Sequence, residues 1–262
     1  MPIIKTIIEN YQSKGISGVV NLFKRKLSEG KVIKRFDVYK PYFNNKQGIE
    51  IGGPSGIFSV ELPIYQIAAD LDGVNFSNQT VWEGKIEEGN NYHFYNGKKG
   101  FQYISEASNL SAVPDEKYEF LVASHCLEHC ANALKTFEEW LRVVKKNGAV
   151  LLILPDKRFT FDHNRSITSF EHLLEDYRKG VDETDLTHMD EILKGHDLSM
   201  DPGGKDFDAF KQRSLDNYHN RCFHHHVFDF DLLKKIYQHY NVEVIDTSFA
   251  YPFHQIILGI KH

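Results

Sequence analysis

Cysteine is scarce in this chain of 262 residues. Its three cysteines, Cys126, Cys130 and Cys222, form an odd and sparse set that does not predict a disulfide framework. No apolar amino-terminal core typical of a signal peptide precedes them, and no run approaches the roughly 18 apolar residues of a membrane-spanning helix. We therefore expect a cytoplasmic protein with reduced thiols.

Signatures of nucleic-acid binding are also missing. The chain contains no zinc-finger or RNA-binding motif, and its net charge of −5 gives no general attraction to phosphate backbones. We expect no nucleic-acid partner.

The charge is unevenly distributed along the chain. Residues 1–46 carry ten Lys or Arg against three acidic residues, a net charge of +7, so the rest of the chain carries −12. Apolar residues in this basic segment fit two short amphipathic helices separated by Gly15 and Gly18. The segment is either a peripheral membrane-binding or partner-binding arm or a helical cap with a solvated basic face.

The remaining residues, 47–262, are expected to form one α/β domain. Within them, Gly48 to Gly56 reads Gly-Ile-Glu-Ile-Gly-Gly-Pro-Ser-Gly. The apolar residues indicate the end of a buried strand, and the glycines indicate a tight loop whose backbone can approach a ligand. Glu50 disfavours a phosphate ligand and favours a cationic or neutral one. An ordinary glycine turn would leave the same pattern.

Further strands are expected at residues 67–71, 100–104, 118–124 and 149–154. The last of these is a continuous apolar run, which suits a parallel strand covered on both faces. A helix carrying Trp140, Leu141 and Val144 on one face lies between the last two strands and should end at the turn containing Gly148. Residues 242–249 and 254–260 indicate a closing antiparallel pair. The alternation of strands and helices predicts a doubly wound sheet.

Asp72 follows the second expected strand, about 20 residues beyond the first loop glycine. A carboxylate at that point of a Rossmann-like unit usually accepts hydrogen bonds from a ribose diol. Asp72 is therefore a candidate ligand for a nucleoside, although a plain strand-end carboxylate would look the same.

Taken together, these residues resemble class I S-adenosylmethionine-dependent methyltransferases of the type 11 group. The sequence Glu50-Ile-Gly-Gly-Pro-Ser-Gly56 is similar to the first motif of that family, and Glu106-Ala107 to its adenine-side acidic motif. The sequence Ser124-His-Cys-Leu-Glu-His129 resembles its fourth motif. Pro54 replaces the usual middle glycine, so the loop must follow a different path there.

The resemblance implies a Rossmann-like, mostly parallel sheet that ends in an antiparallel hairpin and binds S-adenosyl-L-methionine. The residues that it implies for cofactor binding are Glu50, Gly52, Gly53, Gly56, Asp72, Glu106, Ala107, Ser124 and His125. Of these, the backbone of the loop glycines would run beside the amino-acid portion and the ribose of the cofactor, and Ser124 with His125 would lie beside the sulfonium.

Residues 156–222 interrupt the family pattern, and we refer to them as the cap. They are expected to cover a substrate, although a solvated insertion is an alternative. Lys157, Arg158 and Arg165 are candidate ligands for a phosphate or carboxylate on the substrate. Candidate bases are His125, His163, His225 and His226.

The chain contains 14 histidines, and three of them are consecutive, His224 to His226. In an extended segment His224 and His226 would point to one face and could chelate a divalent metal ion, with His163 and His188 as further ligands. The same run could instead form a hydrogen-bonded corner that anchors the cap, or part of a substrate pocket.

The function predicted from these features is O-methylation of a small hydrophilic acceptor such as a sugar, a nucleotide sugar or a phosphorylated metabolite. Two alternatives remain, a metal-dependent hydrolase that uses the histidines and a non-catalytic cofactor-binding partner protein. The sequence does not indicate the oligomeric state.

Overall fold

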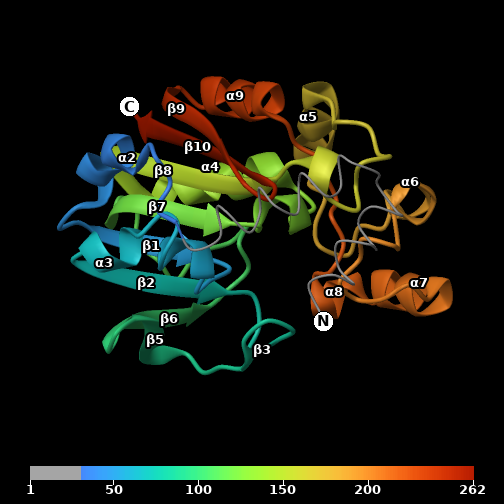
Figure 1. Cartoon of the computed structure of the whole chain (residues 1–262), viewed down its shortest axis with the longest axis horizontal. Helices are drawn as coiled ribbons and strands as arrows, with labels where there is room; N and C mark the ends of the chain where they lie inside the picture. Colours follow the sequence, from blue (N-terminus) through green and yellow to red (C-terminus); the bar gives the residue numbers. More distant parts are fainter. Residues whose placement is uncertain (1–30) are drawn as a thin grey trace, which may run out of the picture.

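A mixed sheet of eight strands forms the centre of the structure, a computed structural model that describes residues 31–262 (Figure 1). The strand order is β5-β6-β2-β1-β7-β8-β10-β9. Neighbouring strands from β6 to β8 are parallel, whereas β5, β10 and β9 are antiparallel to their neighbours. The predicted doubly wound sheet with an antiparallel terminal hairpin is confirmed.

The strands of this sheet are β1 (Gln47–Ile51), β2 (Asp70–Asn75), β5 (Gly89–Tyr95), β6 (Lys98–Ile104), β7 (Tyr118–Ser124), β8 (Val144–Pro155), β9 (Val242–Ala250) and β10 (His254–Lys261). A separate small hairpin is formed by β3 (Gln79–Thr80) and β4 (Gly84–Lys85). The two helices expected within residues 1–30 lie outside the described residues.

Helices cover both faces of the sheet. On one face, α4 (Ala133–Val143) and α9 (Phe230–His239) bury Trp140 and Leu233 against the strands. On the other, α2 (Phe36–Phe43), the short 3₁₀-helix η1 (Gly56–Phe58) and α3 (Ile64–Ile67) bury Phe43 and Tyr65. Coverage on both faces explains why the β8 run from Ala149 to Leu154 is apolar throughout.

Local signals set the ends of α4. Asn132 caps its first turn, accepting a hydrogen bond of 3.1 Å from the Lys135 amide. The turn expected at Gly148 was wrong, because β8 begins at Val144 directly after α4, and Asn147 within that strand takes the left-handed conformation, with φ of 61°. Gly148 is required for a different reason, since a Cβ there would lie 2.5 Å from Cγ1 of Val144.

Two expectations about the first half of the sheet were wrong. The second strand was expected at residues 67–71, but Ile67 belongs to α3 and β2 runs from Asp70 to Asn75. No strand was predicted within residues 73–99, yet this stretch contains the β3–β4 hairpin and the edge strand β5. Asp72 is therefore the third residue of its strand and does not follow it.

The cap lies beyond the carboxyl ends of the parallel strands, at the right of Figure 1. Its helices are η3 (Lys157–Phe159), α5 (Phe170–Lys179), α6 (Met189–Gly195), α7 (Phe207–Leu215) and α8 (Asn217–Asn220). Residues 221–229, which lead from the cap to α9, are called the return segment. A small core of Ile192, Phe210 and Phe223 packs α6 and α7 against it. Within residues 31–262, no helix is both long and apolar enough to cross a bilayer.

Candidate active site

A cavity of about 780 Å³ opens at the carboxyl ends of the parallel strands. Its lining includes Gly52, Phe76, Ser105 and His125, each of which directly follows a strand. Strands β1 and β7 are neighbours in the sheet, and the chain winds outward from them in opposite directions. In open α/β sheets, ligands bind at such a switch point.

The glycine loop forms one wall of the cavity. Gly52 has a φ of +78° and lines the cavity together with Ile51 and Pro54. Gly53 lies outside this lining and is required by packing, because a Cβ there would lie 2.2 Å from Cδ of Glu50. Gly56 begins η1 and also lies outside the lining.

Glu50 supports the loop from beneath. Its fully buried carboxylate accepts hydrogen bonds from the Ser55 amide at 3.0 Å, the Tyr65 hydroxyl at 2.5 Å and the Tyr92 hydroxyl at 2.7 Å. Burial raises the pKa of Glu50 to about 7, although these three hydrogen bonds oppose the rise. Glu50 does not line the cavity, so its expected contact with the cofactor is replaced by this supporting role.

The expectation that Asp72 stands at the carboxyl end of its strand was wrong. Its buried carboxylate accepts hydrogen bonds from Lys117 Nζ at 3.0 Å, the Tyr118 hydroxyl at 2.5 Å and the Phe101 amide at 2.8 Å. These contacts join β2 to β6 and to the start of β7, and Asp72 does not line the cavity.

Asn75 occupies the strand end instead. Its side-chain amide donates to the Gly53 carbonyl at 2.9 Å, and its side-chain oxygen accepts from Trp82 Nε1 at 3.0 Å. Trp82 also lines the cavity, from the connection between β3 and β4. The sequence pattern indicated no role for either residue.

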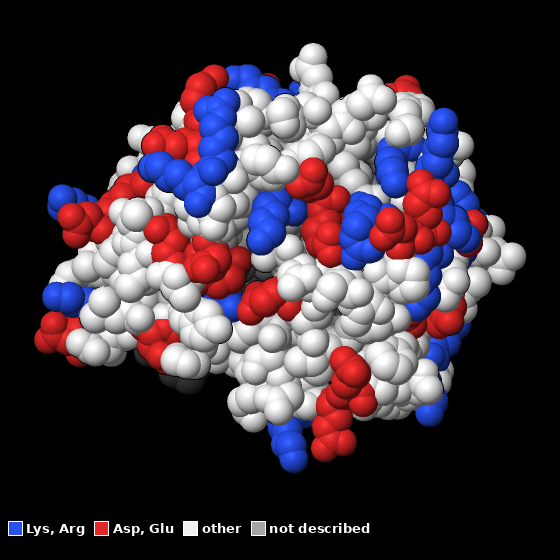
Figure 2. All heavy atoms as spheres, turned by 180° about the vertical axis from the view of Figure 1, so that it is seen from behind, with Lys and Arg blue, Asp and Glu red and all other residues white. Residues whose placement is uncertain are grey.

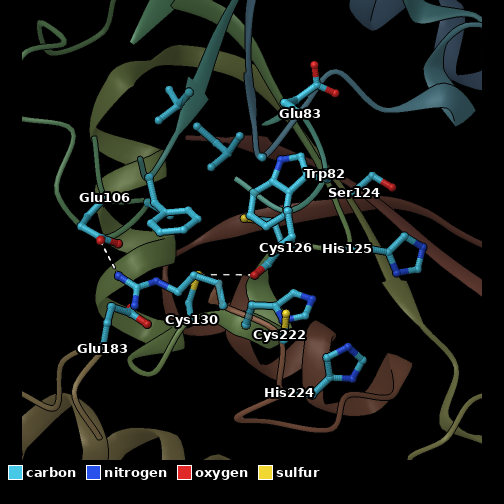
Figure 3. Close-up of a pocket in the computed structure, with 18 of the residues that line it drawn as sticks. Trp82, Glu83, Glu106, Ser124, His125, Cys126, Cys130, Glu183, Cys222 and His224 are labelled. Atoms are coloured by element: carbon cyan, nitrogen blue, oxygen red, sulfur yellow. Dashed lines mark hydrogen bonds and ion pairs between the residues drawn. The ribbon is translucent and has the colours of Figure 1, made fainter. Parts of the chain in front are cut away.

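Glu106 and Ala107 follow β6 and line the cavity at its far side. Oε1 of Glu106 lies 2.5 Å from Nη2 of Arg221, and the Arg221 guanidinium lies 4.8 Å from the centre of the Phe76 ring. Glu183 reaches the same region (Figure 3). Burial raises the pKa of Glu183 to about 7, against the lowering effect of Arg221.

Ser124 and His125 line the cavity where β7 ends. His125 has a φ of +53°, and its Nε2 lies 2.9 Å from Nδ1 of His254 at the start of β10. Its Nδ1 lies 3.3 Å from Oε1 of Glu128. Burial and His125 lower the pKa of His254 to about 3, so that His254 is neutral near pH 7. Nε2 of His125 is therefore engaged by His254, whereas its Nδ1 lies near Glu128 without a well-aligned hydrogen bond.

Glu128, His129 and His224 form a second polar group beside His125. Nδ1 of His129 lies 3.1 Å from the Phe223 carbonyl oxygen, and Nδ1 of His224 contacts Asp162, so Nε2 is the nitrogen left available on each ring. Both rings line the cavity. Within residues 31–262 neither carboxylate oxygen of Glu128 receives a well-aligned hydrogen bond.

The pKa shifts within this group differ in direction. Burial and the neighbouring His224 lower the pKa of His129 to about 4. Burial alone would lower the pKa of His224, but the charge of Asp162 and its hydrogen bond outweigh burial and raise it. Burial would also raise the pKa of Glu128, but His125, His129 and His224 hold it below its ordinary value.

Three of the four predicted bases lie away from the cavity, which corrects the expectation. Nε2 of His163 lies 2.9 Å from Asp197, and His225 and His226 are fully buried. His225 contacts Asn217, and His226 contacts the carbonyl of Ala131. Only His125 among the four lines the cavity, and His129 and His224 join it.

The predicted anion-binding residues are also engaged elsewhere. Lys157 donates to the carbonyl of Arg165, Arg158 pairs with Asp156, and buried Arg165 pairs with Asp162 and Glu191. The basic residues that line the cavity are Arg213 and Arg221. On the face drawn in Figure 2, basic and acidic groups are interspersed, so this face does not present a surface of one charge sign to a ligand.

Among residues 31–262, two groups of side chains could hold a metal ion, because each brings its ligand atoms within 4.8 Å of one another. One is Glu128, His129 and His224, of which the two histidines line the cavity. The other is His172, Asp176, His188 and His226 in and beside the cap. Of the predicted ligands, His188 and His226 thus come together, His224 joins the other group, and His163 belongs to neither.

Comparison with known proteins agrees with this geometry. A family model described as a methyltransferase domain matches residues 24–247. A methyltransferase structure from Mesorhizobium loti has a TM-score of 0.51 at 9% identity and covers 86% of this chain and 95% of that one. One from Methanosarcina mazei has a TM-score of 0.51 at 15% identity, with coverage of 88% and 98%. Both proteins are described as dependent on S-adenosylmethionine.

At these identities the structural similarities bear on the fold alone. No curated protein sequence matches the chain significantly. The family model, however, spans most of the 262 residues, including all four strand ends that line the cavity. The chain therefore belongs to the methyltransferase-domain family and is an S-adenosylmethionine-dependent methyltransferase of the class I fold.

Proposed function

We propose that this enzyme methylates a hydroxyl oxygen of a small hydrophilic acceptor, with His224 as the general base. The observation that carries the proposal is the pair formed by Asp162 and His224. The carboxylate holds Nδ1 of the imidazole, which leaves the Nε2 lone pair on a ring that lines the cavity. A carboxylate in this position orients the ring and stabilises the imidazolium that forms when the base takes a proton.

The cavity suits S-adenosylmethionine in size and lining. Its volume of about 780 Å³ lies in the upper part of the range of about 300 to 1,000 Å³ that is typical of ligand sites. The left-handed Gly52 exposes backbone beside the space for the amino-acid portion. Glu106 and Ala107 would contact the nucleoside, and Ser124 and His125 would flank the sulfonium. When bound, the cofactor supplies a methyl group activated by the positive sulfur.

The residues around the acceptor then have two tasks. They must hold the hydroxyl oxygen in line with the methyl carbon and the sulfur, and they must remove one proton. Nε2 of His224 takes the hydroxyl proton as the new oxygen–carbon bond forms and the carbon–sulfur bond breaks. The products are the methyl ether, neutral S-adenosylhomocysteine and the His224 imidazolium, which later loses its proton to solvent.

A polar acceptor fits the cap side of the cavity. His196, Asp201, Arg213 and Arg221 line it there, and Arg213 pairs with Asp201. A guanidinium near the solvent side can bind a phosphate or carboxylate in two hydrogen bonds. These groups support a sugar, a nucleotide sugar or a phosphorylated metabolite as the acceptor.

A metal-assisted form of the same reaction is the second candidate, and Glu128 favours it. Its two buried oxygens lack well-aligned partners within residues 31–262, and they face two available imidazole nitrogens. A divalent ion there would bind the hydroxyl and lower its pKa. Titration with Mg²⁺ or Mn²⁺ separates the two forms, because a base mechanism without metal predicts a rate that does not depend on the added cation.

The direct test incubates the protein and S-adenosylmethionine with a panel of sugars, nucleotide sugars and sugar phosphates and detects methylated product by mass spectrometry. Binding of S-adenosylhomocysteine is measured in parallel. Binding without any methylated hydroxyl compound would contradict the acceptor class and favour the non-catalytic alternative. Hydrolysis of a panel member without cofactor binding would favour a metal-dependent hydrolase.

A further inference from the structure

Four side chains converge outside the cavity, where α5, the start of α6 and the segment after the cap meet. His172 and Asp176 lie one turn apart on α5, His188 directly precedes α6, and His226 lies in the return segment. Their ligand atoms lie within 4.8 Å of one another. None of the four lines the cavity described above.

Individual distances match a shared central atom. Nε2 of His172 lies 3.1 Å from Nε2 of His188 and 3.2 Å from Oδ2 of Asp176, and the ring centres of His188 and His226 lie 5.2 Å apart. Ligands about 2.0 to 2.1 Å from a tetrahedral zinc ion are roughly 3.3 Å from one another. The two measured separations between ligand atoms are close to this value, and one ligand atom from each of the four side chains lies within 4.8 Å of the others.

Two buried atoms of the cluster lack a hydrogen-bond partner within residues 31–262. They are Oδ2 of Asp176, a residue that is 6% exposed, and Nδ1 of His226, which is fully buried. A buried polar atom without a partner costs free energy unless an ion or water satisfies it. Each atom belongs to a side chain in contact with the other members of the cluster.

The surroundings provide the second layer of contacts that metal ligands require. Nε2 of His226 lies 3.0 Å from the Ala131 carbonyl oxygen, and donating its proton there leaves the lone pair on Nδ1. Nδ1 of His188 faces Oε2 of Glu191 at 3.7 Å, which is too far for a hydrogen bond, and its Nε2 contacts His172. Histidines that bind metal usually donate their other ring proton to a carbonyl or carboxylate, as the geometry of His226 allows.

The geometry points to a structural zinc site formed by His172, Asp176, His188 and His226. Three imidazoles and one carboxylate make four ligands, the number that completes a tetrahedral shell. Imidazole ligands and tetrahedral geometry favour Zn²⁺, whereas Mg²⁺ and Ca²⁺ prefer six or more oxygen ligands. A closed shell outside the cavity implies a role in holding structure rather than in methyl transfer.

The proposed zinc site would also hold part of the active site in place. The backbone amide of His225 donates to the carbonyl of Glu128 at 2.8 Å, and the preceding residue is His224. An ion on His226 therefore fixes the segment that carries the proposed base and ties it to α5 and α6. Without the ion, this segment keeps its backbone hydrogen bonds to Glu128 and Arg165, but only contacts between imidazoles and the Asp176 carboxylate join His226 to α5 and His188.

The test uses untagged protein produced with added zinc, and measures metal content by plasma mass spectrometry. One zinc ion per chain is expected, and X-ray absorption should show four nitrogen or oxygen neighbours, including imidazoles. His172→Ala removes the most exposed of the four ligands and should lose most of the metal and lower the melting temperature. His219→Ala, an exposed histidine that pairs with Asp216 and belongs to neither metal-binding group, is the matched control and should retain the ion.

A second pair of variants separates the two metal-binding groups. Glu128→Gln removes the carboxylate from the cavity group and should leave the zinc content unchanged. Loss of zinc in Glu128→Gln but not in His172→Ala would place the ion in the cavity and overturn the proposal, as would zinc-free protein. S-adenosylhomocysteine binding by His172→Ala verifies that the variant is folded, and if it fails to fold, the more conservative His172→Gln takes its place in the same comparison.

Discussion

The carboxylate of Asp162, at the start of the cap, accepts a hydrogen bond from Nδ1 of His224, 62 residues further along the chain. Arg165 holds the other carboxylate oxygen at 2.9 Å. Burial would raise the pKa of Asp162, but His224 and Arg165 outweigh burial and lower it. Asp162 is consequently ionised at any pH at which the enzyme would work. The chain thus provides a fixed negative charge behind one imidazole of the cavity.

This charge leads to a prediction for the pH dependence of turnover. The base must be neutral, and Asp162 raises the pKa of His224 above its ordinary value of 6.5. The turnover number should therefore increase with pH through a pKa above 6.5. Asp162→Asn should move this acid limb to lower pH and reduce the plateau rate, because the imidazolium loses its stabilising charge.

Removing the base itself should have the larger effect. His224→Ala should reduce turnover by about 10² to 10⁴-fold at saturating cofactor and leave the affinity for S-adenosylhomocysteine nearly unchanged. His125→Ala is the comparison, because the Nε2 atom of that ring already contacts His254. An acid limb that persists in His224→Ala and disappears in His125→Ala would assign the base to His125.

A third prediction concerns the cofactor. Glu106 lines the cavity and pairs with Arg221 through Oε1, which leaves Oε2 for the amino group of adenine. Glu106→Gln should weaken the binding of S-adenosylhomocysteine by about tenfold, or roughly 1.4 kcal/mol, measured by calorimetry. Glu138→Gln, an exposed position on α4, is the control and should bind normally. Equal affinities in the two variants would remove Glu106 from the site.

Asn75, rather than Asp72, should affect cofactor binding, whereas Asp72 should affect only stability. Asp72→Asn weakens a buried network with Lys117 and Tyr118, so it should lower the free energy of unfolding by about 1 to 3 kcal/mol. Its affinity for S-adenosylhomocysteine should not change. Asn75→Ala releases the Gly53 carbonyl and Trp82, so it should weaken binding. Denaturant unfolding and calorimetry on both variants measure the two effects separately.

The error at Asp72 shows what periodicity alone could not resolve. The apolar residues Ile64, Ile67, Ala68 and Leu71 straddle α3 and β2, and a short apolar run does not distinguish helix from strand. A shift of three residues in the strand moved the expected ribose ligand away from the cavity. By contrast, β7 and β8 were predictable because both carry continuous apolar runs long enough for buried strands.

The histidines were harder to place for another reason. His224 and His226 were expected on one face of a strand, but residues 221–229 adopt no regular secondary structure. His224 consequently contacts Asp162 near the cavity, whereas His226 contacts the cap cluster. His129 stood in the motif already singled out, Ser124 to His129, so its position in the cavity could have been inferred. The contribution of Arg221 depends on a left-handed backbone that the sequence does not indicate.

The last prediction uses Glu50, the buried carboxylate beneath the glycine loop. Its pKa is raised from 4.5 to about 7 in the folded protein, chiefly by burial. The folded state therefore keeps a proton that the unfolded state releases above pH 4.5, so the contribution of Glu50 to stability is full below that pH and is lost as the pH rises toward 7.

Glu50→Gln keeps an acceptor for the Ser55 amide and cannot ionise. Relative to this variant, the wild type should lose roughly 3 kcal/mol of unfolding free energy between pH 4.5 and 8, measured by urea unfolding. Glu138→Gln, at the exposed position on α4, should show no such difference. Parallel pH profiles for the wild type and Glu50→Gln would mean that Glu50 is ionised throughout, and that the loop rests on a charged carboxylate.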